Sequence, residues 1–517
     1  MRPARPRAPS HARGEDRPPL LTSCRTPVFV GPVEGITLGE PDLPPAVADL
    51  GEGHVLSSTS HHADHADVIV VGAGAAGLSA ALALTAAGIG VSVLEASDRP
   101  GGRMTTEETD GFRLDRVGRF LSTSHRELHR LPDLSALTLR PFAPGVLVHG
   151  DGRLHRTGEV VRRRSPAPVP YPRAHPDGAD PSGAYGAWAA RRGVGGALTM
   201  ARALASAPRP LDEARLGASL ARLAGMSAAR LAARPERSAA EAIAARGLPA
   251  RTVGGFLHPL LSALLCDPEL TTSSRCADLV LRSFARGRLC VPEGGSGAVP
   301  DLLAAALPPG TVLTGVRVKE ASINRVSTEE YGELTCRALV LATGAREAAE
   351  LLPGLRVPDF HPVTLLHHSA PEAPPTGAAL VLDADRTGPV AHTAVMSAVD
   401  PTRAPEGRAL ITSAVLGTPP AGPDAVVRAQ LARMYGVPTG DWELLAVHRT
   451  PDAVPAMPAP HDPRRRVRVL SGLYVCGDHR DTSTVQGALR SGRRAAQAVL
   501  RDFGVPGVPE LPLAASS

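Results

Sequence analysis

Three glycines in the stretch from Asp67 to Met104 have the spacing of a dinucleotide-binding turn. Gly72, Gly74 and Gly77 follow a short β-branched run and precede an alanine- and leucine-rich segment, so a strand meets a helix at this turn. The first glycine permits the turn, the second lets the backbone approach a pyrophosphate, and the third lets the helix pack closely on the strand. The spacing therefore predicts a phosphate site at the amino end of the helix.

The elements around this turn complete a nucleotide-binding unit. We expect a strand over residues 67–71, a helix over 75–87 and a second strand over 91–94. Glu95 ends the second strand about 20 residues after the glycines, where a carboxylate accepts a hydrogen bond from a ribose 2′-OH and disfavours a 2′-phosphate. The unit predicts a Rossmann-type α/β domain, in which the helix dipole and free N–H groups hold the phosphates without a cationic side chain.

A second motif, Gly101-Gly102-Arg103, follows shortly after Glu95. With the glycine turn, it resembles the superfamily of flavin amine oxidases, phytoene desaturases and protoporphyrinogen oxidases, in which this segment lies along the FAD pyrophosphate. The resemblance covers most of the chain after residue 66, but its specific motifs lie only in the FAD-binding segments. It implies a glutathione-reductase-like FAD-binding fold of the amine-oxidase subgroup, interleaved with a mixed α+β substrate domain, and FAD bound noncovalently.

The stretch 472–500 carries the second half of the resemblance. It is expected to be a strand ending at Gly477 and Asp478, a loop, and a helix from about Thr484. By position in the family, Asp478 would bind the ribitol-phosphate region and the start of the helix would face the flavin ring. A helix amino terminus there stabilises negative charge that develops on the flavin.

Two middle stretches also resemble the family. Residues 284–307 contain a P-x-G-G-x-G-x-x-P pattern, and a strand expected over 311–318 ends at Val318, whose backbone would meet adenine. A further strand is expected over 338–342. The full set of cofactor-binding residues predicted in this way is Gly72, Gly74, Ala75, Ala76, Gly77, Glu95, Ala96, Gly101, Gly102, Arg103, Val318, Gly477, Asp478, Val485, Gln486 and Gly487.

One departure from the family lies at residues 111–121. Family members commonly have an acid, one residue and then glycine, whereas here Asp115 is followed by Arg116 and Val117, and glycine comes only at Gly118. In the family this segment approaches the flavin. A bulkier Val117 is therefore expected to change access to the ring.

The resemblance implies transfer of a hydride equivalent from a substrate C–H bond to flavin N5, then reoxidation by an acceptor such as oxygen or a quinone. Lys319, the only lysine, lies beside the expected adenine strand, and aromatic residues make up 3% of the chain. In many amine oxidases of this superfamily a lysine faces flavin N5 and aromatic side chains orient the amine. The position of Lys319 and the low aromatic content therefore favour desaturation or oxidation of a lipophilic or cyclic small molecule. An amine oxidase lacking the lysine that faces N5, and a noncatalytic flavin- or lipid-binding protein, are the alternatives.

No residue is assigned as a catalytic acid or base. Arg119, His479, Arg480 and Asp481 are candidates near the flavin, and an exposed loop position is the alternative for each. Cys476 does not match the position of covalent flavin attachment.

The FAD-binding domain is predicted to be discontinuous, over 61–150, 285–358 and 468–505, with the substrate domain over 151–284 and 359–467. Hydrophobic periodicity predicts helices at 211–223, 238–245 and 253–266. Short apolar runs between Pro, Gly and Asp predict strands at 363–367, 378–382, 391–395 and 409–415. The stretch 254–266 is expected to pack in the core, the alternative being an entrance for a lipid-like substrate or a peripheral membrane contact.

Composition indicates a globular enzyme. The chain has 517 residues, 43% of them hydrophobic, and a net charge of +5 with dispersed basic residues, which does not support nucleic-acid binding. Residues 1–54 are rich in Pro, Arg and Gly and are predicted to be a disordered leader, with translation from Val55 as an alternative. No segment predicts a secretion signal or a membrane span.

Cysteine and histidine usage predicts a cytoplasmic protein with no metal site. The six cysteines are widely spaced, as expected of reduced thiols. His61, His62 and His65 lack a matching carboxylate or cysteine and are expected to lie in a solvated leader.

Overall fold

The computed structural model describes residues 65–131, 134, 136–158 and 210–506. The predicted leader at 1–54, its alternative start at Val55, and His61 and His62 lie outside these residues, as do residues 159–209 of the predicted substrate domain. His65, which was expected to lie in the leader, is instead the first residue of a strand and pairs with Thr335.

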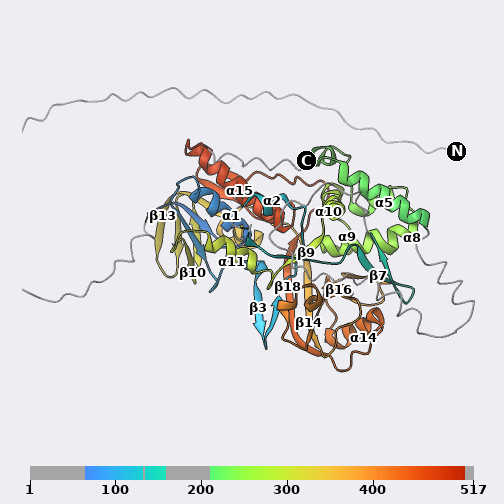
Figure 1. The fold of residues 1–517 in the computed structure, drawn as a ribbon. Helices are drawn as coiled ribbons and strands as arrows, with labels where there is room; N and C mark the ends of the chain where they lie inside the picture. The colour runs from blue at the N-terminus through green and yellow to red at the C-terminus, as the bar shows by residue number, and fades with distance from the viewer. Residues whose placement is uncertain (1–64, 132–133, 135, 159–209, 507–517) are drawn as a thin grey trace, which may run out of the picture. The chain divides into compact units, whose positions relative to one another are not determined.

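An eight-stranded sheet is built around the glycine turn (Figure 1). Its parallel strands are, in order, β10 (Val312–Thr314), β2 (Val91–Glu95), β1 (His65–Val71), β13 (Glu333–Leu341) and β20 (Leu473–Val475). Antiparallel pairing adds β11 (Val318–Ser322), β12 (Arg325–Thr328) and β19 (Arg468–Leu470). The strands expected at 67–71, 91–94 and 338–342 are therefore present, with β13 longer than predicted.

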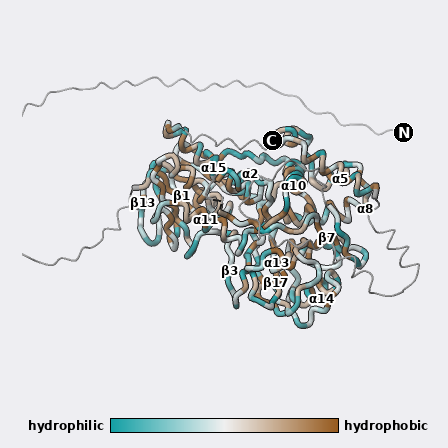
Figure 2. The backbone as a smooth tube through the Cα atoms, viewed as in Figure 1, coloured by the Kyte–Doolittle hydropathy of each residue, from teal (hydrophilic) through white to brown (hydrophobic). Residues whose placement is uncertain are grey.

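Both faces of this sheet are covered, as the continuous apolar run in β1 requires. Val68 and Val70 pack toward the helices α1 (Ala75–Thr85) and α15 (Val485–Asp502), with α11 (Ala298–Ala305) alongside. Ile69 and Val71 face a second cluster that includes α12 (Ala345–Leu351). In Figure 2, β1 is coloured brown, which marks hydrophobic residues.

A seven-stranded sheet is formed by the second half of the chain and one earlier hairpin. Its strands are, in order, β18 (Glu443–Pro455), β14 (Phe360–Ala370), β17 (Ala409–Leu416), β16 (Val390–Val395), β15 (Val381–Asp383), β7 (Val146–Gly150) and β8 (Arg153–Thr157). The four strands expected between 363 and 415 are present, whereas β18 was not predicted. Because β7 pairs with β15, residues 146–150 belong to this sheet, although the predicted boundary at 150 groups them with the FAD-binding segments.

Helices cover the seven-stranded sheet on both faces. On one face, α14 (Pro423–Tyr435), which was not predicted, contributes Val427, Leu431 and Met434 to a core with Leu366 and Ile411. The other face packs on helices from the segment 210–286. These are α5 (Pro210–Gly225), α6 (Ala228–Ala232), α7 (Ala239–Ala244), α8 (Ala250–Thr252), a π-helical turn (Val253–Leu257), α9 (His258–Leu265) and α10 (Ser274–Arg286).

Short elements connect the two sheets. They are the hairpin β3 (Thr106–Thr109) and β4 (Phe112–Asp115), the small sheet of β5 (Leu121–Ser122), β9 (Leu289–Pro292) and β6 (Leu139–Pro141), the helices α2 (Arg126–Arg130) and α13 (Met396–Val399), and three 3-10 turns at Gly102–Met104, Pro401–Arg403 and Asp478–Arg480.

Two local predictions need comment. The strand expected over 311–318 is wrong as a continuous element, because β10 ends at Thr314, Gly315 has a φ of 72°, and the N–H of Val316 donates to the Glu95 carbonyl at 2.9 Å. The predicted core packing of 254–266 is confirmed, since Phe256, Leu257 and the following leucines are buried. Within the described residues, no helix has the length and apolarity needed to cross a membrane.

Candidate functional site

The glycine turn has the geometry that its spacing predicts. Gly72 has a φ of 105°, and a Cβ there would lie 3.1 Å from the backbone of Ala342 on the neighbouring strand. A Cβ on Gly77 would overlap the carbonyl of Gly72. A Cβ on Gly74, in contrast, would have nothing within 4 Å. Gly72 and Gly77 therefore satisfy packing, whereas the space beside Gly74 is open for a ligand.

The amino end of α1 faces this open space without a capping side chain. Gly74 is the N-cap, and the first turn of the helix contains no acid. The first N–H groups of a helix have no acceptor within the helix, so those of Ala75, Ala76 and Gly77 suit a phosphate. These groups lie where the sequence predicts an anion site.

Glu95 is buried beside the glycine turn. Its carboxylate accepts hydrogen bonds from the N–H groups of Ala73, at 2.7 Å, and Ser97, at 2.9 Å. These bonds fix the carboxylate at the end of β2. A carboxylate has about four acceptor positions, so Glu95 keeps capacity for a ribose hydroxyl.

Arg103 and Asp478 form an ion pair that joins the two predicted halves of the cofactor site. The Arg103 guanidinium donates to both carboxylate oxygens of Asp478, at 2.7 and 2.9 Å, and to the carbonyl of Ala453 at 2.8 Å. Burial alone would raise the pKa of Asp478, but the charge and hydrogen bonds of Arg103 hold that pKa below its ordinary value. Two motifs 375 residues apart in sequence are thus linked by a charged, bidentate contact.

The start of α15 leaves a polar group free. Thr484 caps the helix by accepting the N–H of Gly487 at 3.0 Å, as the predicted start at Thr484 requires. A Cβ on Gly487 would overlap the Thr482 carbonyl. The side-chain Oε1 of Gln486 is buried and has no hydrogen-bond partner among the described residues. An unsatisfied acceptor next to a helix amino terminus fits a cofactor ring that offers an N–H donor.

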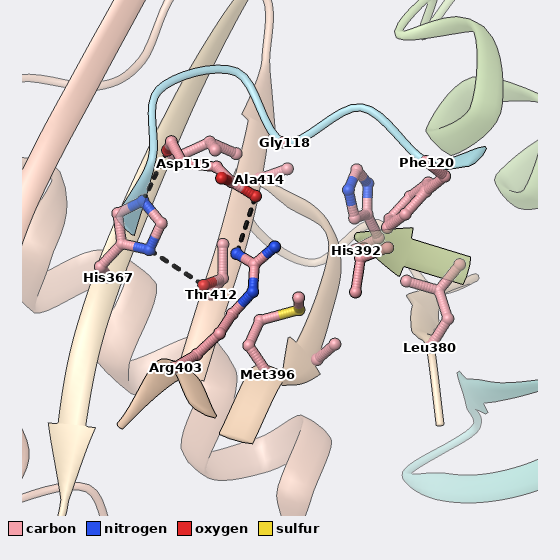
Figure 3. A pocket seen from close by; sticks show the side chains of 13 residues that line it. Asp115, Gly118, Phe120, His367, Leu380, His392, Met396, Arg403, Thr412 and Ala414 are labelled. Atoms are coloured by element: carbon pink, nitrogen blue, oxygen red, sulfur yellow. Dashed lines mark hydrogen bonds and ion pairs between the residues drawn. The ribbon is translucent and has the colours of Figure 1, made fainter. Parts of the chain in front are cut away.

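Asp115, at the end of β4, holds several segments together (Figure 3). Its Oδ1 accepts from the Thr106 hydroxyl at 2.7 Å and from the Ser296 N–H at 2.8 Å, and its Oδ2 accepts from Arg403 at 2.7 Å. Burial would raise the pKa of Asp115, but the charge of Arg403 and these hydrogen bonds hold it below the ordinary value. The residue is therefore an ionised structural acid.

The backbone carbonyl of Asp115 is also bonded to the second sheet. It accepts from His367 Nε2 at 3.0 Å and from His448 Nδ1 at 3.2 Å. The Nδ1 of His367 then accepts from the Thr412 hydroxyl at 2.9 Å. Burial is the main cause that lowers the pKa of His367 to about 3, so this imidazole is neutral at pH 7.

Two adjacent cavities lie beside this network, with volumes of about 30 and 10 Å³. The residues that line both are Gly118, Phe120, Leu365, His392 and Ala414. The ring of Phe120 lies 5.3 Å from that of His392, centroid to centroid (Figure 3). Small-molecule sites usually occupy about 300–1,000 Å³, so these cavities mark where apolar side chains gather and not a full substrate volume.

The departure at Val117 and Gly118 lies at the edge of these cavities. Val117 is buried with Cys266, Val363 and Leu365, and it lines the smaller cavity. Gly118 has a φ of 61°, and a Cβ there would lie 2.9 Å from a methyl carbon of Leu365. The left-handed backbone explains why glycine stands at 118.

The structure separates the four candidates for proton transfer. His479 and Asp481 are buried, so the alternative of an exposed loop is wrong for both. Burial lowers the pKa of His479 to about 4. Asp481 is ion-paired with Arg490 and Arg494 near the start of α15, which assigns it a structural role. The candidates therefore reduce to His479, Arg480 and Arg119.

Arg119 lies at the smaller cavity, and its guanidinium donates to Cys266 Sγ at 2.7 Å and to the Ser483 carbonyl at 2.8 Å. Lys319 is exposed and pairs with Glu329 at 3.2 Å, which agrees with its predicted place outside the reaction site. Burial raises the pKa of Cys476 to about 12, so it is a poor nucleophile for a covalent flavin link.

Sequence reasoning missed His367, His392 and Arg403. His367 and His392 stand in strands, β14 and β16, that carry other polar residues as well, so neither position is distinguished in the sequence. Arg403 offered no signal, because its partner Asp115 is 288 residues away.

The fold and the site together define a dinucleotide-binding α/β protein with a second sheet behind the binding region. A family model described as flavin containing amine oxidoreductase matches residues 75–500, and the chain belongs to this family. This confirms the resemblance and the fold class predicted from the sequence, and it implies a flavin cofactor.

Similarity to curated proteins is confined to short segments. The chain is 46% identical to putrescine oxidase of Kocuria rosea over 92 residues, which are 17% of this chain and 19% of that protein. It is 58% identical to phytoene dehydrogenase of Streptomyces griseus over 52 residues, 10% of each chain. The chain thus matches at most about a fifth of these relatives' length.

Solved structures share the fold over a longer span. Wild-type putrescine oxidase bound to putrescine aligns with a TM-score of 0.59 and 18% identity, over 84% of this chain and 99% of that one. Cyclohexylamine oxidase from Brevibacterium oxydans IH-35A aligns with a TM-score of 0.57 and 19% identity, over 85% and 100% of the two chains. At this identity the likeness concerns the fold.

The open space beside Gly74 gives a first prediction. Gly74→Val should lower FAD affinity at least tenfold, equivalent to about 1.4 kcal/mol, because the added side chain fills the space for the pyrophosphate. The apoprotein should keep its stability, since a Cβ at this position meets no protein atom within 4 Å. The measurements are FAD titration and urea unfolding of the apoprotein. Gly217→Ala, at an open position of α5, is the control and should keep FAD. Unchanged FAD affinity in Gly74→Val would place the phosphates elsewhere.

The Asp115 network gives a second prediction. Asp115→Asn should lower the free energy of unfolding by about 3–5 kcal/mol, because it leaves Arg403 buried without a full counter-charge. Urea unfolding at pH 7 measures the change, and Lys319→Gln, which breaks an exposed pair, should change little. A small loss in Asp115→Asn would show that Asp400 alone satisfies Arg403.

Proposed function

We propose that this chain is an oxidoreductase that binds FAD noncovalently and oxidises a C–H bond of a lipophilic or cyclic small molecule. FAD, when bound, accepts a hydride equivalent at flavin N5 and passes the electrons to an acceptor such as oxygen or a quinone. Family membership supports the flavin, and the lining of the cavities supports the class of substrate.

The residues that would hold FAD come from the two motifs predicted from the sequence, the glycine-rich segment 72–103 and the segment 477–487. The N–H groups of Ala75, Ala76 and Gly77 would bind the pyrophosphate, and Glu95 would accept the ribose hydroxyl. The Arg103–Asp478 pair would hold the ribitol-phosphate region. The start of α15 would face the ring, and there Gln486 Oε1 lacks a partner among the described residues. Ala96, Gly101, Gly102, Val318, Gly477, Val485 and Gly487 stay predicted contacts.

The observation that carries the proposed substrate class is the side-chain composition of the larger of the two cavities, which at about 30 Å³ would be part of a substrate space and not the whole of it. Its apolar lining comes from Phe120, Val291, Leu365, Leu380 and Met396 among others. Its charged residues, Asp115 and Arg403, already neutralise each other. Such a lining favours an apolar substrate, because a buried charge needs a partner that this wall does not offer.

An ammonium substrate would meet an unfavourable charge in the adjacent, smaller cavity. Arg119 lines the smaller cavity and gives its two hydrogen bonds to neutral acceptors, the Cys266 sulfur and the Ser483 carbonyl. A second cation beside this guanidinium is destabilised by repulsion. The cavity therefore supports amine oxidation less well, although the relatives with short matching segments include putrescine oxidase.

A visible spectrum under anaerobic conditions tests this function. The purified holoprotein should be yellow, and it should be bleached by cyclic hydrocarbons or polyenes and not by diamines such as putrescine. Bleaching by amines alone would replace the proposal by amine oxidation. A flavin that dithionite reduces but no substrate in the panel bleaches would favour a noncatalytic binding protein. A colourless chain that cannot be reconstituted with FAD would remove the flavin as well.

Among the residues that line both cavities, His392 is the one with a polar side chain. It takes no part in the Asp115–Arg403 ion pair. Burial lowers its pKa to about 4, so it is neutral above that pH and can exchange a hydrogen bond with substrate without adding charge. His392→Leu should lower the bleaching rate at least about tenfold if this bond orients the substrate. The wild-type rate should show no inflection from His392 near pH 6.5. An inflection there that His392→Leu abolishes would contradict the neutral state.

A further inference from the structure

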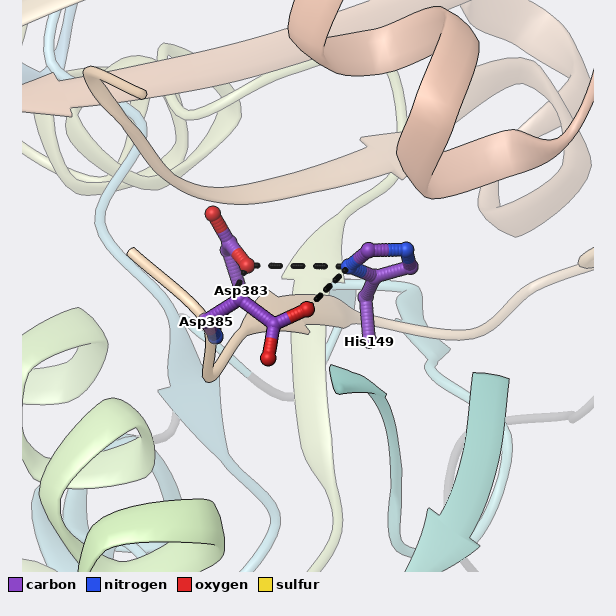
Figure 4. Close-up of side chains that lie close together, drawn as sticks. All are labelled: His149, Asp383 and Asp385. Carbon is purple, nitrogen blue, oxygen red and sulfur yellow. Dashed lines mark hydrogen bonds and ion pairs between the residues drawn. The ribbon is translucent and has the colours of Figure 1, made fainter. Parts of the chain in front are cut away.

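A buried histidine and two aspartates meet at the end of β7 and β15, in a place that the oxidoreductase function does not use (Figure 4). His149 lies on β7, Asp383 ends β15, and Asp385 follows in the connection to β16. One ligand atom from each residue lies within 4.8 Å of the others. The sequence predicts no metal site, and the histidines considered for one there were His61, His62 and His65.

The distances within this group are within ion-pair reach but longer than ordinary hydrogen bonds. His149 Nδ1 lies 3.7 Å from Asp383 Oδ1 and 3.5 Å from Asp385 Oδ2. Two ligands bound tetrahedrally to zinc at about 2.1 Å lie about 3.4 Å from each other. The separations match the edges of a coordination tetrahedron better than direct bonds between the side chains.

His149 is itself an unusual buried group. Its side chain is 6% exposed, and neither ring nitrogen has a hydrogen-bond partner among the described residues. Figure 4 shows its Nδ1 directed at both carboxylates. A buried imidazole without a hydrogen-bond partner lowers the stability of the folded protein, and a bound ligand at this nitrogen would remove that cost.

The two carboxylates are already oriented by other bonds. Asp383 accepts from the Asp385 N–H at 3.1 Å and from Gln430 Nε2 at 2.7 Å. The Oδ1 of Asp385 accepts from the Asp151 N–H at 3.0 Å, and its Oδ2 faces His149. Hydrogen bonds of this kind hold metal-binding carboxylates in position.

We propose that His149, Asp383 and Asp385 bind a divalent transition-metal ion such as zinc. One nitrogen and two oxygen ligands suit a tetrahedral ion, and water would take the fourth position on the exposed side of Asp385. The ion would join β7 to the β15–β16 hairpin. That hairpin carries His392, whose strand partner Leu382 precedes Asp383, so the ion would also brace one wall of the cavity.

The test uses the full-length, untagged holoprotein after treatment with a chelator. Calorimetric titration with zinc chloride at pH 7.5 should show a site that Asp385→Asn weakens at least about tenfold. The same zinc addition should raise the thermal midpoint of the wild type and not of the variant.

Asp151→Asn is the matched control. It removes a carboxylate from the same turn, tolerates the φ of 51° at this position, and leaves all three ligands in place, so zinc affinity should be kept. The flavin absorbance of each variant reports that it is folded. Equal zinc affinity in Asp385→Asn and Asp151→Asn would assign any binding to other histidines and overturn the proposal. Absence of zinc binding by the wild type would do the same.

Discussion

The ion pair of Asp115 and Arg403 is the contact on which the arrangement of this protein most depends. Both side chains are almost completely buried, and such a pair is stable only when hydrogen bonds satisfy the rest of each group. Asp115 receives these bonds from Thr106 and Ser296, and Arg403 is also bonded to Asp400. One carboxylate therefore joins the β3–β4 hairpin, the loop after β9 and the second sheet. Its loss would loosen the contact between these three segments and the wall of the larger cavity, which Asp115 and Arg403 both line.

The Asp115 network explains why the stretch 292–300 is rich in glycine. Gly294 donates its N–H to Asp400 at 2.8 Å, and Gly297 donates to the Thr106 hydroxyl at 3.0 Å. Gly295 has a φ of 127°, and a Cβ there would overlap the side chain of Thr106. The family pattern at this place is thus explained by close approach to the Asp115 network, and direct contact with a cofactor is not needed to account for it.

Local signals predicted much of the nucleotide-binding part of the fold. The glycine turn and the Thr484 cap are short-range features, because the residues that determine each lie within one turn or one strand. The Asp115–Arg403 pair and the placement of β7 beside β15 could not be predicted in this way. Each depends on which distant segments the tertiary fold brings together, and neither leaves a periodicity or spacing in the sequence. The helix α14 was missed because its Pro423 start and mixed polar face resemble a loop.

The same reasoning explains how the chain accommodates its departure from the family pattern. Gly118 adopts a left-handed backbone directly against the Leu365 side chain, so a larger residue there would be strained and would displace a Leu365 methyl group. The preceding Val117 consequently turns into the apolar cluster of Val363 and Ala414 and narrows the smaller cavity. Since the Asp115 network fixes this segment at one end and Arg119 ties it to the start of α15 at the other, its path has little freedom. Phe120 and His392, which line both cavities, then present an aromatic face and a neutral hydrogen-bonding group to them.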